Sequence, residues 1–115
     1  MSDSITCPDR GDVGWLSLNP QAGHEQRGRR PVICLSSKKY NLKSGLAIFC
    51  PITSKVKGYP FEVPLETSGD KVMGVVLSDQ VKSLDWRQRK FEYADEVSEE
   101  TLGGVCNLAV MLITN

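Results

Sequence analysis

The sequence predicts a mainly β fold: a small, mostly antiparallel sheet, curled or barrel-like, with one C-terminal helix. Short runs of β-branched and apolar residues follow one another along the chain, and the connectors between them are short and rich in Gly, Asn, Ser and Lys. Only the C-terminal segment repeats its apolar residues at spacings of three and four. A chain of 115 residues with 40% hydrophobic content can fill one modest core, so residues 1–115 are expected to form a single domain.

The strands are expected where apolar residues run together or alternate with polar ones. In chain order, the first four cover Val13–Asn19, Pro31–Ser37, Gly45–Thr53 and Pro60–Glu66. The stretch Val72–Leu84 is expected to form one long strand or two strands joined by a bend. Residues 85–89 (DWRQR) suit a helical turn capped by Asp85, and residues 90–97 (KFEYADEV) suit a last strand.

The C-terminal segment carries the signals of a helix start. Ser98 is the expected N-cap, Val97 and Leu102 occupy the two staple positions, and two glutamates follow where the positive end of a helix favours acids. Although Gly103 and Gly104 lower helix propensity, an apolar stripe follows that is expected to pack on the sheet: Leu102, Val105, Cys106, Ala109, Leu112 and Ile113.

The charges balance in number but not in position. The 14 basic and 14 acidic residues cancel, which argues against the strongly cationic surface of a non-specific nucleic-acid binder. Bases nevertheless cluster from Arg27 to Lys43, and acids cluster from Glu92 to Glu100. One end of the molecule is therefore expected to face an anion while the other is a solvated surface.

The cysteines and the N-terminus indicate a cytoplasmic protein. Four cysteines stand far apart, without metal-ligand spacing, and are interpreted as buried free thiols. An early acidic residue, the lack of an apolar signal region and the lack of any window near roughly 18 apolar residues predict neither secretion nor a membrane span.

The stretch GHEQRGRRP, residues 23–31, gathers polar side chains between glycines. Pro31 favours an extended conformation of Arg30 at the mouth of the next strand, which would position that guanidinium better than its neighbours. A positioned guanidinium can hold a phosphate, and a nearby carboxylate or imidazole, such as Glu25 or His24, can move a proton. The alternative is a solvated charged loop, with His24 as a polar surface residue.

Two further stretches combine polar residues with strand ends. In PITSKVKGYPFEV, Thr53 ends an apolar strand, where a hydroxyl is either a turn-former or a catalytic group. In SDQVKS, polar side chains interrupt an apolar region, where they either form structural hydrogen bonds or face a ligand.

Taken together and in order, these stretches resemble the MazF/PemK (Kid) toxins of bacterial type II toxin–antitoxin pairs. The resemblance spans nearly the whole chain and rests on GDVGWLSLNPQAGHEQRGRRPVICLS, PITSKVKGYPFEV, SDQVKSLDWRQR and the final SEETL segment. It implies an SH3-like barrel with short helices that works as a homodimer. It also implies a sequence-specific, metal-independent endoribonuclease (an mRNA interferase) that cuts single-stranded RNA and is neutralised by a MazE/PemI-like antitoxin.

The resemblance also implies roles for particular residues. Catalysis falls to Glu25, Arg30 and Thr53. The antitoxins of the family have an acidic C-terminal segment, and we expect it to contact the bases from Arg27 to Lys43 with Lys55 and Lys57, and the aromatic rings of Tyr59 and Phe61. RNA contacts are expected at Arg10, His24, Gln26, Lys57, Asp79, Gln80 and Lys82. The Kid/PemK branch has an Arg two residues before the Asp of its DQ pair, whereas this chain has Leu77, so the chain resembles the MazF branch and Asp79 is not assigned as an acid or base.

The sequence contains no cluster of His, Cys and carboxylates at metal-ligand spacing, so no cofactor is expected and side chains are expected to do the chemistry. Two other functions stay open. A toxin of the same fold that poisons DNA gyrase would resemble relatives with a tryptophan near the C-terminus, whereas this chain ends MLITN. A small RNA-binding module without catalysis would explain the bases and aromatics but not the pairing of Glu25 with Arg30.

Overall fold

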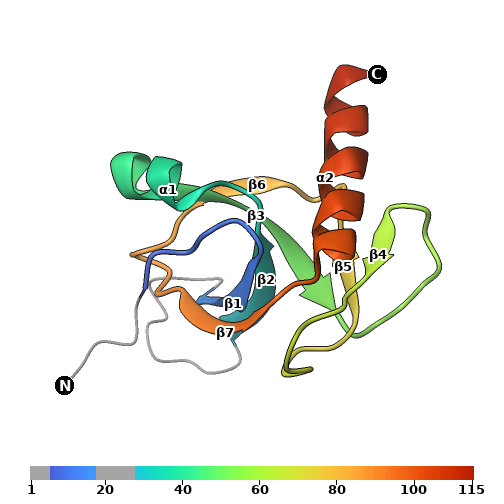
Figure 1. Ribbon diagram of the computed structural model, residues 1–115, viewed down its shortest axis with the longest axis horizontal. Coiled ribbons are helices and arrows are strands. Elements are labelled where there is room, and N and C mark those ends of the chain that lie inside the picture. Colours follow the sequence, from blue (N-terminus) through green and yellow to red (C-terminus); the bar gives the residue numbers. More distant parts are fainter. Residues whose placement is uncertain (1–5, 18–27) are drawn as a thin grey trace.

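The computed structural model describes residues 6–17 and 28–115. Figure 1 shows a curled sheet with one short helix at one end and a longer helix that leaves it at the other. The elements of the described residues follow in the order β1 (Asp12–Ser17), β2 (Arg29–Cys34), α1 (Lys38–Ser44), β3 (Leu46–Thr53), β4 (Glu62–Pro64), β5 (Val75–Leu77), β6 (Lys82–Asp85), β7 (Glu92–Glu96) and α2 (Glu99–Thr114).

The strands form a single antiparallel network in the order β4-β5-β3-β2-β1-β7. The edge of β3 that does not pair with β2 is divided between two strands: its first half pairs with β6, and its last two residues pair with β5. A bridge between Thr67 and Val97 also joins the segment after β4 to the end of β7. The sheet is therefore curled and barrel-like without being closed, which confirms the predicted fold class.

Most strands lie where the sequence predicts them, with shifted ends. The stretch 72–84 forms two strands, β5 and β6, separated by a turn. The predicted turn at residues 85–89 is present, because the Asp85 carboxylate accepts hydrogen bonds from the backbone N–H groups of Arg87 (3.0 Å) and Gln88 (2.9 Å). Strand β4 covers only three residues of the predicted stretch 60–66.

Helix α1 was not predicted from the sequence, although its signals are there. Ser37 caps its start, and Gly45 ends it in the left-handed conformation with φ of 76°. Its buried Asn41 donates to the carbonyl oxygens of Pro8 (2.8 Å) and Ser36 (3.2 Å). A short helix held by one buried polar side chain lacks the apolar periodicity on which the sequence interpretation relied.

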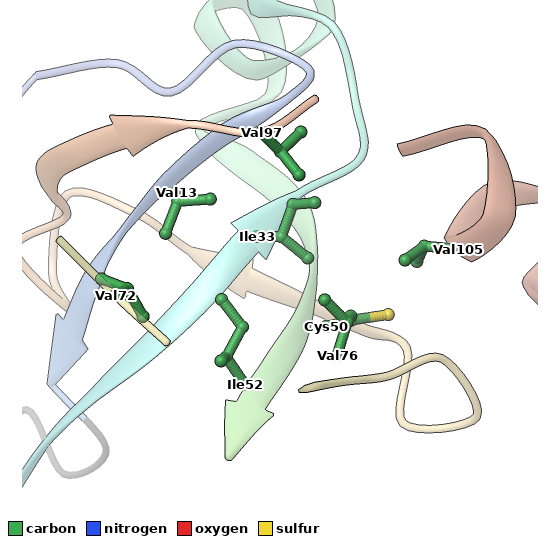
Figure 2. Packing of buried hydrophobic residues seen from close by; sticks show 8 residues of the cluster. All are labelled: Val13, Ile33, Cys50, Ile52, Val72, Val76, Val97 and Val105. Atoms are coloured by element: carbon green, nitrogen blue, oxygen red, sulfur yellow. The ribbon is translucent and has the colours of Figure 1, made fainter. Parts of the chain in front are cut away.

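The core has two parts, on opposite faces of the sheet. Along β2 the side chains alternate, so Ile33 joins one cluster and Val32 joins the other. The first cluster, shown in Figure 2, includes Val105 of α2. The second contains the rings of Phe49 and Phe91, stacked with their centroids 5.9 Å apart. This second cluster lies next to the start of β2, where Arg30 is found.

Helix α2 begins as predicted, but only its first half packs on the sheet. The Ser98 side chain accepts a hydrogen bond from the backbone N–H of Thr101 (3.1 Å), and Val105 and Ala109 are buried. Leu112 is 41% exposed and Ile113 is 77% exposed, so the prediction that the whole stripe packs on the sheet is wrong. The helix is straight and extends beyond the last strand, as Figure 1 shows, so its final turns have no sheet beneath them.

The cysteines are all free, but only two are buried. Burial raises the pKa of Cys34 to about 11 and that of Cys50 to about 12. Cys7 and Cys106 are partly exposed, which corrects the interpretation of all four as buried thiols. Within residues 6–17 and 28–115, no helix has both the length and the apolar character needed to cross a membrane.

Candidate functional site

Arg29, the first residue of β2, holds strands together. Its guanidinium donates to the Ser17 hydroxyl (3.0 Å) and to the carbonyl oxygens of Trp15 (3.3 Å) and Lys90 (3.0 Å). It also lies 3.4 Å from a carboxylate oxygen of Glu92. Both terminal nitrogens of the guanidinium thus contact β1 or the start of β7, which gives Arg29 a structural role.

Arg30 is the neighbouring arginine and differs from Arg29 in its contacts. It pairs in register with Leu16 of β1, and alternation turns it to the face opposite that of Arg29. Within the described part of the chain its guanidinium has no hydrogen-bond or ion-pair partner. It lines three adjoining depressions of the surface. A half-buried guanidinium with unused donors is a ready site for an oxyanion.

The first depression, here called the Thr53 pocket, has a volume of about 250 Å³. It brings together residues from the end of β3, the loop after it and the turn after β5, which are far apart in sequence. Eight of the predicted site residues line it: Arg30, Thr53, Lys55, Lys57, Tyr59, Phe61, Asp79 and Gln80. Glu62 and Leu77 complete the lining.

Thr53 lies on the same face as Arg30, at the end of β3. The pairing of β2 with β3 ends at Val32 and Pro51, and Arg30 and Thr53, two residues beyond each, line the same two depressions. The Thr53 hydroxyl accepts a hydrogen bond from the backbone N–H of Lys55 (3.1 Å), which orients it. Gly74, with φ of 132°, packs against the Thr53 carbonyl so closely that a Cβ there would collide with it.

The loop after Thr53 is exposed but not without structure. The Glu62 carboxylate accepts hydrogen bonds from the backbone N–H groups of Lys57 (3.1 Å) and Gly58 (3.0 Å). The Lys57 ammonium lies 6.0 Å from the centre of the Tyr59 ring. Because Glu62 is engaged with the loop backbone, the cations at positions 55 and 57 face solvent beside the pocket.

The second depression, here called the Phe49 pocket, has a volume of about 210 Å³ and lies on the other side of Arg30 and Gln80. Gln80 reaches it from the turn after β5, where its N–H bonds the Leu77 carbonyl (3.1 Å), and Lys82 reaches it from β6. Ser17 and Arg89 also line it and were not among the predicted site residues. No local pattern marks them, because only the pairing of strands brings them to Arg30.

The third depression, here called the Lys71 groove, is the largest at about 600 Å³. Trp15, Lys71 and Met73 line it together with Arg30 and Thr53, and none of these first three was predicted. The buried carboxylate of Asp95 accepts hydrogen bonds from the backbone N–H groups of Gly69, Lys71 and Glu96. These bonds hold the loop that carries Lys71 in place.

The chain matches, over residues 9–112, the family model described as "PemK-like, MazF-like toxin of type II toxin-antitoxin system". It belongs to this toxin family. The resemblance inferred from the sequence motifs is thereby confirmed, on its MazF side as well as in its fold.

Its similarity to individual members of the family extends over most of both chains. The Endoribonuclease toxin MazF of Escherichia coli (strain K12) is 46% identical over 95 residues, which are 83% of this chain and 84% of that protein. A crystal structure of MazF from Deinococcus radiodurans has a TM-score of 0.83 at 46% identity and covers 96% of this chain and 99% of that one. A crystal structure of MazE–MazF from the same organism has a TM-score of 0.83 at 40% identity, again over 96% and 99%.

Some predicted site residues of this toxin-family chain are not placed with Arg30. His24, Glu25 and Gln26 lie outside the described residues, so their predicted roles stay predictions. Arg10 lies before β1, where its Nε donates to the Leu35 carbonyl (2.9 Å) at the far end of β2. Leu35 is five residues further along the chain than Arg30, a distance of about 16 Å at roughly 3.3 Å per residue. An RNA contact by Arg10 would require a substrate that extends well beyond the three depressions.

The basic residues do not form the single surface that their order in the sequence suggests. Lys38, Lys39 and Lys43 belong to α1, which precedes β3, whereas Lys55 follows it. The length of β3, about 23 Å at roughly 3.3 Å per residue, separates the two groups. The run from Arg27 to Lys43 is therefore divided: Arg30 lies near Thr53, whereas the lysines of α1 lie beyond the other end of β3.

Proposed function

We propose that this endoribonuclease toxin cleaves single-stranded RNA with the scissile phosphate held by Arg30. The observation that carries the proposal is the contrast between two adjacent arginines. Arg29 spends its donors on the sheet, whereas Arg30 keeps its guanidinium unpaired among described residues, where three depressions meet beside the Thr53 hydroxyl. Proteins named endoribonuclease among its relatives support the same activity.

The simplest chemistry uses the substrate's own 2′-hydroxyl as nucleophile. A base removes its proton, the O2′–P bond forms, and the P–O5′ bond breaks, which leaves a 2′,3′-cyclic phosphate and a 5′-hydroxyl. Glu25 is the proposed base, with His24 as a possible helper in proton transfer. Arg30 and Thr53 stabilise the charge that builds on the phosphate oxygens. A positioned base contributes about 10²–10⁴-fold and one electrostatic donor about 10²–10³-fold, so a few side chains suffice without a metal ion.

Base-reading groups surround the phosphate position in this proposal. Asp79 and Gln80, on the turn beside the Thr53 pocket, combine acceptors and donors that can discriminate base edges. Lys57 and Lys82 add positive charge for the backbone. We place the reaction in the cytoplasm, where messenger RNA is found and where free thiols such as those of this chain persist.

The antitoxin is proposed to bind over the Thr53 pocket. Lys55, Lys57 and Tyr59 are exposed and Phe61 is half-buried, which offers charge and aromatic anchors to an acidic, extended segment. An occupant of this surface would compete with RNA for Arg30. A Lys55→Glu, Lys57→Glu double variant should bind a cognate antitoxin more slowly and with a weaker salt dependence. Equal rates at every salt concentration would contradict this assignment.

A homodimer is proposed because α2 leaves apolar side chains uncovered. Val110, Met111, Leu112 and Ile113 are 41–77% exposed on the part of the helix beyond the sheet. Such a patch is unusual on a monomer and suits a second copy of the chain. Light scattering should give the dimer mass at micromolar concentration, and Ile113→Glu should shift it toward the monomer.

Cleavage itself is tested with purified protein, a long RNA and EDTA, followed by sequencing of the new 5′ ends. Arg30→Ala should abolish cleavage, Thr53→Ala should lower it strongly, and Arg30→Lys should not restore it because an ammonium lacks the planar fork. Lys39→Ala on α1 is the matched control and should cleave like the wild type. DNA of the same sequence should survive. Wild-type rates from a folded Arg30→Ala protein would overturn the proposal, and RNA binding without cleavage would point to a binding module.

A further inference from the structure

The two smaller depressions share a wall. Arg30 and Gln80 line both the Thr53 pocket and the Phe49 pocket. If the scissile phosphate lies on Arg30, the nucleotides on its two sides lie within reach of the depressions that Arg30 lines. Thr53 lines the Thr53 pocket and the Lys71 groove but not the Phe49 pocket, so the Phe49 pocket is the depression beside Arg30 that is free for an adjoining nucleotide.

The floor of the Phe49 pocket is apolar. Leu16, Val32 and Phe49 come from three neighbouring strands and face the same side, with only 1–5% of each exposed. Leu84 and Pro51 extend this floor. An apolar floor favours the face of a base, which can pack against apolar side chains. A phosphate placed there would lose its hydration and gain no compensating contact.

The rim of the pocket is rich in hydrogen-bond donors. Lys82 is exposed at the first position of β6, and its ammonium can donate but not accept. Arg30 likewise only donates, whereas the Gln80 amide can do both. None of the described residues that line the pocket carries a carboxylate. If a base presented an amino group to Lys82, two hydrogen-bond donors would therefore face each other without an acceptor.

We propose that the Phe49 pocket binds the base next to the scissile phosphate and selects guanine or uracil, which carry a carbonyl oxygen at position 6 or 4, over adenine or cytosine, which carry an amino group there. Lys82 is the residue that makes this selection, because its ammonium pairs with O6 and N7 of guanine or O4 of uracil. The inference rests on the proposed cleavage of RNA and adds to it which kind of base one flanking position accepts.

The experiment uses short single-stranded RNAs that contain one mapped cleavage site, with all four bases placed in turn at each of the two flanking positions. At one of these positions the wild type should favour guanine or uracil by roughly 5- to 150-fold in kcat/KM, the range typical of one good base contact. Lys82→Glu should erase or reverse this preference there and leave the other position unchanged. Lys82→Gln serves if the glutamate variant does not fold, and Lys39→Glu on α1 is the control for the same charge change.

A second measurement separates this inference from the proposed function. The same oligonucleotides, carrying a 2′-deoxyribose at the cleaved nucleotide, report binding without chemistry. Base-selective binding that depends on Lys82 supports the pocket assignment even if no RNA is cleaved, in which case only the proposed function fails. A uniform loss of binding and kcat/KM for all four bases in Lys82→Glu would show that Lys82 contacts phosphate, and it would overturn the assignment of the pocket to a base.

Discussion

Replacing Arg29 and Arg30 one at a time by methionine should separate stability from catalysis. Methionine keeps much of the aliphatic bulk and removes the donors. In Arg29→Met, the Ser17 hydroxyl and the carbonyls of Trp15 and Lys90 lose their partner. At about 1 kcal/mol net for each hydrogen bond, the expected loss is about 2–3 kcal/mol. The Glu92 contact adds little, because that carboxylate side chain is 52% exposed.

In a chain of this size, 1 kcal/mol corresponds to a change in Tm of about 4 °C. Arg29→Met should therefore melt about 8–12 °C below the wild type, whereas Arg30→Met should stay within about 0.5 kcal/mol of it. Urea unfolding at one fixed protein concentration measures both, with an unchanged slope as the sign that two-state behaviour holds. RNA cleavage by Arg30→Met should be lost in the folded protein. Equal destabilisation by both substitutions would refute the division of roles between the two arginines.

Three further outcomes follow from the structure. Gly74→Ala should destabilise the protein by about 1–3 kcal/mol in urea and lower cleavage, because a Cβ would collide with the Thr53 carbonyl; unchanged stability would contradict this. Burial acts to raise the pKa of Asp95, but hydrogen bonds from backbone N–H groups outweigh it and lower that pKa. Asp95→Asn should therefore cost about 1–2 kcal/mol at pH 7, a difference that shrinks as the pH falls below about 4 and through the lowered pKa; a difference that does not shrink as the pH is lowered would contradict it. Since burial raises the pKa of Cys34 to about 11 and of Cys50 to about 12, native-state alkylation at pH 8 should be at least about 100-fold slower for both than in urea, as mass spectrometry of labelled peptides would show.

Much of the local structure could be predicted because its causes are local. The Ser98 cap, the Asp85 turn and the apolar strands each depend on residues close together in sequence. Helix α1 was missed because a single buried Asn41, bonded to Pro8, replaces an apolar stripe. The exposure of Ile113 could not be predicted either, since helical periodicity says nothing about where the sheet beneath a helix ends.

By itself the sequence determined the fold class, the toxin family and eight residues, Arg30 among them, that line one pocket. Only the tertiary structure decided which neighbours these residues have. Two adjacent arginines look alike in sequence, yet the pairing of β1 with β2 gives Arg29 four partners and turns Arg30 toward the pockets. The lysines of α1 belong to the same basic run, Arg27–Lys43, as these two arginines, but the length of β3 separates them from Lys55. The physical reason is that strand register, a property of pairing between distant segments, chooses which side chains converge on one face.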